Sequence, residues 1–207
     1  MYRQGKTAEA AVEFDKLIAG NPNDEGLKVW KALALLEQAR GMRDAKAPQY
    51  KPLVLNAWAI LRAMGQEQQA NPDWNLAVGK ALWLNERPER GKGFVEKAVS
   101  LRPNYAEALL LLGDMAYDEK GLSNTADPTV RWRSIMALRK AYENFLAAAD
   151  VPPDQRAEAL FKMDMISADF EKKNEAARDY WQQAVAADPD SRYGRMAQEK
   201  LNTMPAK

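Results

Sequence analysis

Asp114 and Asp118 lie four residues apart, the spacing that brings two carboxylates onto one face of a helix. Such a pair could bind a hard cation or share a proton. Charges at this spacing more often form the solvated face of a helix, and that is the interpretation we favour. The segment 89–93, Glu-Arg-Gly-Lys-Gly, combines two glycines with two cations as a phosphate-binding loop does. No strand precedes it, so we expect a packing role for its glycines.

The residue types that are missing exclude most catalytic chemistry. The chain has no histidine and no cysteine, which removes imidazole bases, Ser–His hydrolysis, thiolate nucleophiles and most transition-metal sites. None of its few serines stands in a nucleophile-elbow context. We therefore expect a protein that is not an enzyme and that uses no cofactor or metal.

Charge and hydropathy limit the kinds of partner. Thirty basic and 29 acidic residues give a net charge of +1, which does not favour nucleic acid as a partner. No uncharged apolar run reaches the ~20 residues of a membrane span, so we expect no direct membrane insertion of this segment. The residues after Met1 are polar and do not resemble a signal peptide.

Helical periodicity accounts for nearly the whole chain. Apolar residues recur every three or four positions, glycines and prolines fall between these stretches, and no segment alternates as a strand would. In the stretch 129–149, for example, one apolar stripe runs from Trp132 through Ile135, Leu138 and Tyr142 to Phe145. The predicted helices are 7–19, 24–43, 51–69, 73–85, 88–101, 104–119, 129–149, 154–171, 174–187 and 190–203.

A half-unit ending in proline recurs four times, at Pro22, Pro103, Pro153 and Pro189. A small residue stands twelve positions before each proline, at Ala10, Gly91, Ala141 and Ala177. A larger one stands eight positions before it, at Phe14, Val95, Phe145 and Trp181. The small residue allows two helices to approach closely, the large one fills the space beside it, and the proline ends the helix. A repeat of helical hairpins is the fold that this pattern predicts.

The pattern resembles the tetratricopeptide repeat (TPR) family. Its first-helix signature is best matched by Ala106–Leu109 with Leu112-Gly113 and Tyr117, and less well by Val78-Gly79 with Trp83. The resemblance implies an all-α, right-handed superhelical solenoid of about ten helices, forming a single domain over residues 1–207. The implied units are a half repeat at 1–23, then 24–72, 73–103, 104–153 and 154–189, and a closing helix at 190–207.

The first unit begins with the second helix of a hairpin. We therefore expect the natural protein to begin upstream of residue 1, with the first helix of this hairpin. Without that helix, Val12 and Leu17 should be partly exposed. Two connections, 42–50 and 121–127, are longer than a TPR turn. They are either tolerated insertions or added contact surface.

In TPR solenoids the first helix of each hairpin lines a concave groove. The register of Leu112-Gly113 implies the groove residues Leu76, Lys80, Trp83, Leu84, Glu107, Leu110, Asp114, Tyr117 and Asp118. Aromatic side chains within a polar rim are typical of interaction hot spots. Trp83 and Tyr117 could instead pack between helices, as the aromatic residues of this family often do. Asp114 would repel a carboxylate, which argues against a clamp for chaperone C-termini.

We therefore predict a TPR scaffold that binds a protein or peptide segment in its groove and helps to assemble a complex. Residues 190–197, Asp-Ser-Arg-Tyr-Gly-Arg-Met-Ala, resemble the closing helix of bacterial envelope TPR proteins, which commonly assist secretion or cytochrome maturation. That resemblance favours a periplasmic or membrane-anchored location over the cytoplasm. Two alternatives stay open: a scaffold that self-associates through its open N-terminal half repeat, and an accessory part of a larger enzyme or regulator.

Overall fold

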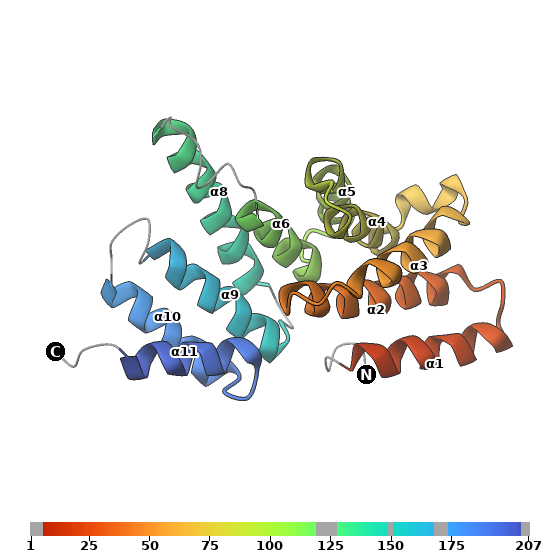
Figure 1. The fold of residues 1–207 in the computed structure, drawn as a ribbon. Coiled ribbons are helices and arrows are strands. Elements are labelled where there is room, and N and C mark those ends of the chain that lie inside the picture. The colour runs from red at the N-terminus through yellow and green to blue at the C-terminus, as the bar shows by residue number, and fades with distance from the viewer. Residues whose placement is uncertain (1–5, 119–127, 149–150, 168–173, 204–207) are drawn as a thin grey trace. The chain divides into compact units, whose positions relative to one another are not determined.

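The structure is a computed structural model that describes residues 6–118, 128–148, 151–167 and 174–203. The side chains of a few residues inside these ranges, among them Tyr117, Asp118 and Met165, are not described. Within the described ranges the chain is helical, with ten α-helices and one 3-10 helix and no strand, so the all-α prediction is confirmed (Figure 1). The predicted turn 121–127 lies outside the described residues.

The helices follow the predicted order with small shifts at their ends. They are α1 (Thr7–Gly20), α2 (Glu25–Asp44), α3 (Tyr50–Arg62), η2 (Gln66–Ala70), α4 (Pro72–Leu84), α5 (Pro88–Leu101), α6 (Ala106–Asp118), α8 (Pro128–Leu146), α9 (Pro153–Met165), α10 (Asn174–Ala187) and α11 (Arg192–Thr203).

Side-chain caps and prolines fix several helix starts. Asp24 accepts a hydrogen bond from the backbone N–H of Leu27 at 3.0 Å and so caps α2. Asn71 caps α4 in the same way, accepting from the backbone N–H of Asp73 at 2.9 Å, and Pro72 follows it at the first helical position. Proline suits that position because the first-turn N–H has no partner within the helix.

One predicted helix is wrong in its extent. The stretch 51–69 is not continuous, because α3 ends at Arg62 and the short helix η2 follows. Between them Gly65 adopts an extended backbone with φ −75° and ψ 173°. Glycine disfavours a helix interior by about 1 kcal/mol relative to alanine, so the helix breaks there.

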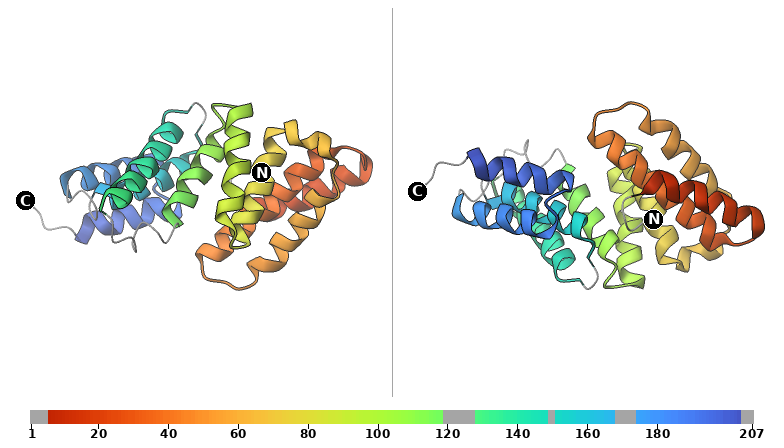
Figure 2. Two further views of the ribbon diagram at one scale, coloured as in Figure 1. Left: turned by 90° about the horizontal axis from the view of Figure 1, so that it is seen from above. Right: turned by 90° about the horizontal axis from the view of Figure 1, so that it is seen from below.

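The chain divides into two compact units, residues 1–108 and 109–207, and the boundary lies within α6. In the first unit α2 packs on α1, α3 and α4, and α4 packs on α5. In the second unit α9 packs on α8, α10 and α11, and α10 packs on α11 (Figures 1 and 2). The arrangement of all hairpins as one solenoid stays a prediction.

Gly79 lies where α4 and α5 approach each other closely. A Cβ added to Gly79 would lie 2.5 Å from Val95 Cγ2 and 2.9 Å from the backbone oxygen of Gly91. Of the two glycines in the segment 89–93, Gly91 has the expected packing role, whereas Gly93 is exposed with no atom within 4 Å of an added Cβ. Gly113 on α6 has an equivalent place in the second unit, because its Cβ would lie 2.6 Å from a ring carbon of Tyr142. Gly79 and Gly113 both belong to the pairs that carry the TPR resemblance.

Most positions of the recurring half-unit are core positions. Ala10, Gly91 and Ala177 are buried, and so are Val95, Phe145 and Trp181. In the second unit Ala177, Trp181 and Ala184 form a core cluster with Ala157, Leu160, Phe161 and Ala197.

Val12 and Leu17 on α1 are exposed, as predicted. Trp132 corrects the predicted stripe of α8: it is 51% exposed, whereas Ile135, Leu138 and Tyr142 are buried. The stripe of an amphipathic helix is buried only over the length that neighbouring elements cover, and on α8 that length begins at Ile135.

Candidate partner-binding surfaces

The apolar residues predicted for the groove are buried side chains. Leu76, Trp83, Leu84 and Leu110 all belong to the core. Trp83 is 4% exposed, and the guanidinium carbon of Arg43 lies 3.8 Å from the centre of its ring. This burial agrees with the alternative in which Trp83 packs between helices. A role for Trp83 in binding stays a prediction, and it would require Arg43 to move aside.

The charged groove residues of the first unit belong to a row of ion pairs. This charged row consists of Glu37, Arg40, Lys80 and Glu107, from helices α2, α4 and α6. The Lys80 ammonium contacts the Glu37 carboxylate and donates to Glu107 Oε1 at 3.0 Å. Arg40 Nε donates to Glu37 Oε1 at 2.8 Å. The structure thus brings together Lys80 and Glu107, both predicted from sequence, and adds Glu37 and Arg40.

The charged row is buried at its centre and reachable at its ends. Lys80 is 3% exposed, while the side chains of Glu37 and Glu107 are 21% and 15% exposed. Burial by itself would raise the pKa of Glu37, but the charges of Arg40 and Lys80 outweigh it and lower that pKa to about 2. Burial likewise opposes the charged form of Lys80, and the carboxylates of Glu37 and Glu107 outweigh it and raise its pKa. Glu37 and Lys80 are therefore both held in their charged forms at neutral pH.

Asp114 belongs to a similar cluster inside the second unit. This Lys162 cluster consists of Asp114, Tyr142, Glu158 and Lys162, from α6, α8 and α9. Lys162 Nζ donates to Asp114 Oδ1 at 2.6 Å and to Glu158 Oε1 at 2.7 Å, and the Tyr142 hydroxyl donates to Asp114 Oδ1 at 3.1 Å.

The Lys162 cluster corrects the expectation that Asp114 lies on a solvated face. Asp114 is buried, because Lys162 and Tyr142 compensate its charge there. Burial opposes the charged form of Lys162, but the two carboxylates outweigh it and raise the pKa of Lys162 well above its ordinary value. Burial also raises the pKa of the Tyr142 hydroxyl. Tyr117 and Asp118 lie outside the described side chains.

Glu37, Arg40 and Lys162 are not among the residues predicted from the sequence. Two of them could have been found from one feature of the sequence, a charged residue within an apolar helical run. Glu37 follows Leu35-Leu36, and Lys162 stands between Phe161 and Met163. Long charged side chains are almost never fully buried unless they are paired, so each position predicts a partner on a neighbouring helix.

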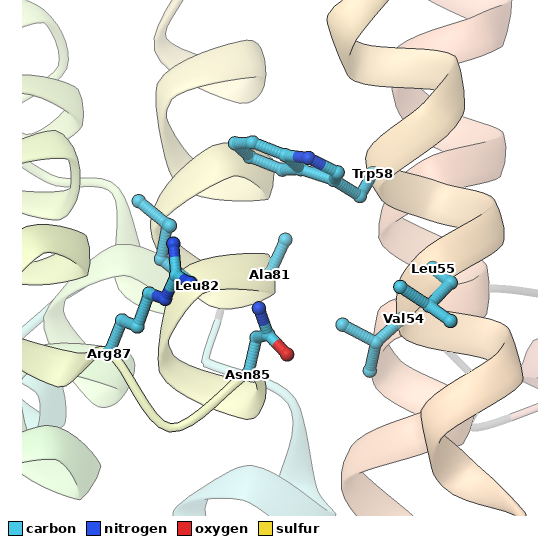
Figure 3. Close-up of a pocket in the computed structure, with 7 residues that line it drawn as sticks. All are labelled: Val54, Leu55, Trp58, Ala81, Leu82, Asn85 and Arg87. Atoms are coloured by element: carbon cyan, nitrogen blue, oxygen red, sulfur yellow. The ribbon is translucent and has the colours of Figure 1, made fainter.

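A small pocket opens between α3 and α4 in the first unit. It encloses about 60 Å³ and is lined by Val54, Leu55, Trp58, Ala81, Leu82, Asn85 and Arg87. Figure 3 shows the α3 side chains of this set facing those of α4 and of the turn after it across the opening. Ligand sites for small molecules are typically about 300–1,000 Å³, so this pocket has room for a side chain but not for a cofactor.

The turn after α4 places Arg87 at the rim of this pocket. Glu86 adopts the left-handed conformation at φ 60°. Its backbone N–H donates to the Trp83 carbonyl at 3.1 Å, and that of Arg87 donates to the Leu82 carbonyl at 2.9 Å. This pair of bonds is the Schellman ending of a helix, which folds the chain back over its last turn. Arg87 consequently lies beside Leu82.

The described residues hold no group of three or more acidic side chains arranged to bind a metal ion. None of the described helices is both long enough and apolar enough to cross a bilayer. No protein-family model matches this chain, and neither does any curated protein.

Proposed function

We propose that this chain is a nonenzymatic scaffold of TPR-like helical hairpins that binds a protein or peptide partner. Two observations support the TPR-like architecture. Gly79 and Gly113 each lie where a Cβ would clash with the next helix, and the small residues of the recurring half-unit are mostly in the core. Assistance in assembling a bacterial envelope complex is part of the proposal and depends on the resemblance of residues 190–197.

The observation that carries the binding proposal is the charged row beside Trp83. It joins Glu37, Lys80 and Glu107 from three different helices, and Lys80 stands three residues before Trp83 on α4, whose ring the Arg43 guanidinium approaches to 3.8 Å. The outer carboxylates remain reachable from solvent. A partner carrying lysine or arginine would be attracted by them and could replace Arg43 over the ring.

Arg43→Ala is the variant that tests this proposal. The substitution removes the guanidinium that lies 3.8 Å from the centre of the Trp83 ring and leaves the core side chains in place. A partner identified by cross-linking to the full-length protein should then bind more tightly, by about tenfold if its own cation gains a contact of ~1.4 kcal/mol. Isothermal titration calorimetry measures the change, and Lys97→Ala on the exposed surface of α5 is the matched control. Equal affinity of wild type and Arg43→Ala would contradict binding at this surface.

Self-association is a second candidate because Val12 and Leu17 are exposed on α1. Exposed apolar side chains on one helix favour association with another apolar surface. Sedimentation velocity should then show a dimer that Val12→Glu dissociates. A monomer at all accessible concentrations would exclude this candidate.

A further inference from the structure

The surface of α3 beside the pocket carries two apolar side chains between two cations. Lys51, Leu55, Trp58 and Arg62 follow one another at spacings of four, three and four residues, which places them on one stripe of the helix. Leu55 is 62% exposed, and Lys51 and Arg62 are exposed as well. The stripe thus carries an apolar centre with a positive charge at each end.

The pocket offers a place for one apolar side chain. Its walls are Val54, Trp58, Ala81 and Leu82, and its rim carries Asn85 and Arg87. The pocket encloses about 60 Å³, and its mostly apolar walls would bind water poorly. A short branched aliphatic side chain suits such a space, with the Leu55 side chain beside it at the surface.

Three cations surround this apolar centre without a partner among the described residues. Lys51, Arg62 and Arg87 form no ion pair with any described side chain. The acidic side chains nearest to Arg87 in the chain are Glu86 and Glu89, and neither forms an ion pair with it there. A carboxylate is the group that an arginine fork binds best, through two parallel hydrogen bonds.

We propose that the α3–α4 surface binds an acidic segment of a protein partner by one aliphatic anchor residue. The anchor enters the pocket between Trp58 and Leu82. A carboxylate beside it pairs with Arg87, and further carboxylates along the segment lie against Lys51 and Arg62. This surface differs in residues and in charge from the charged row, so either proposal can be wrong without the other.

A labelled synthetic peptide tests this proposal directly. The probe is a short fluorescein-labelled peptide of glutamates with one central leucine, and fluorescence anisotropy with the full chain measures its binding. A matched peptide with serine in place of the leucine should bind at least ~5-fold more weakly, since the anchor contributes buried apolar area. Binding should weaken further as salt rises from about 0.05 to 0.5 M, because the Debye length shortens.

Two variants and one control place the binding on this surface. Arg87→Gln and Leu55→Ser change exposed side chains, and each should reduce affinity at least ~5-fold while the helicity and melting temperature stay the same. Arg90→Gln, an exposed arginine on the neighbouring helix α5, should bind as the wild type does. Arg43→Ala should also leave this binding unchanged, which separates the result from the charged-row proposal.

Three outcomes would overturn the proposal. One is equal binding of the leucine and serine peptides, and another is wild-type binding by Arg87→Gln. The third is a different occupant: tighter binding of single-stranded oligouridine than of the acidic peptide, or a dimer in sedimentation that Leu55→Ser dissociates.

Discussion

Replacing Lys80 by methionine should destabilise the fold more than any single change at an exposed charge. Methionine keeps much of the volume of the lysine side chain but leaves the carboxylates of Glu37 and Glu107 without their ammonium partner. Breaking a buried pair by removing one member typically costs about 3–5 kcal/mol. For Lys80→Met the free energy of unfolding should fall by about 3 kcal/mol, at the lower end of this range. The loss is limited because Glu37 keeps its ion pair with Arg40 and because water partly reaches both carboxylates.

The acid dependence of stability gives an independent measure of the same interaction. The pKa of Glu37 is lowered from its ordinary value of 4.5 to about 2, so its ionised form stabilises the folded state. This stability is complete above pH 4.5 and is lost as the pH falls toward 2. A shift of this size corresponds to roughly 3 kcal/mol, in line with the loss expected for the substitution. In Lys80→Met the pKa of Glu37 should rise, and the stability lost between these pH values should be smaller.

Urea unfolding followed by far-UV circular dichroism measures both effects. Lys97→Met, on the exposed surface of α5, makes the same chemical change without a buried partner and should stay within about 0.5 kcal/mol of wild type. If Lys80→Met costs no more than Lys97→Met and keeps the acid dependence of the wild type, the charged row does not stabilise the fold as argued.

Three further substitutions test the packing, each by urea unfolding. Gly79→Ala should lower the free energy of unfolding by about 1–3 kcal/mol, because the added Cβ meets Val95 and the α5 backbone. Gly93→Ala, whose Cβ meets no atom within 4 Å, should raise the free energy of unfolding by up to ~1 kcal/mol. The reverse order of stabilities would contradict the α4–α5 contact. Ala184→Leu in the buried cluster should lower the free energy of unfolding by about 1–3 kcal/mol, whereas Ala186→Leu on the exposed side of α10 should leave it almost unchanged. Equal effects of the two substitutions would argue against the register of α10. Tyr142→Phe should cost about 1 kcal/mol by removing the hydroxyl that donates to Asp114, and an unchanged midpoint would show that this bond adds nothing.

Much of the helical order follows from local chemistry that the sequence displays. Proline at 72, 88 and 153 stands at the first position of α4, α5 and α9, where its fixed φ favours a helix start. Gly79 and Gly113 belong to the pairs that carry the TPR resemblance, and each lies where an added Cβ would come within 3 Å of an atom of a neighbouring helix. These features depend on neighbours in the chain or on one adjacent helix, which is why pattern alone predicts them.

The charged row could not be predicted in the same way. Lys80 pairs with Glu37 across 43 residues and with Glu107 across 27, so the pairing depends on how helices from different hairpins are aligned. No local pattern fixes that alignment. The same limit applies to Trp132, whose position on an apolar stripe does not show how far neighbouring helices extend along α8. At Gly65 a local signal exists, because glycine disfavours a helix interior, but Val54, Trp58, Leu61 and Met64 recur at helical spacing up to that glycine and favour a longer helix.

Lys80 also affects the local unfolding of the first unit. Chains built from hairpins that contact only their neighbours can unfold piece by piece from an end. The Lys80 ammonium is paired with Glu37 on α2 and with Glu107 on α6, so detaching either helix removes one of the two carboxylates that compensate its buried charge. A half-open form of this unit is therefore costly, and native-state hydrogen exchange should find nearly equal protection in the middle of α2 and of α4. This network of ion pairs thus couples α2, α4 and the first turn of α6 into one cooperative part of the first unit.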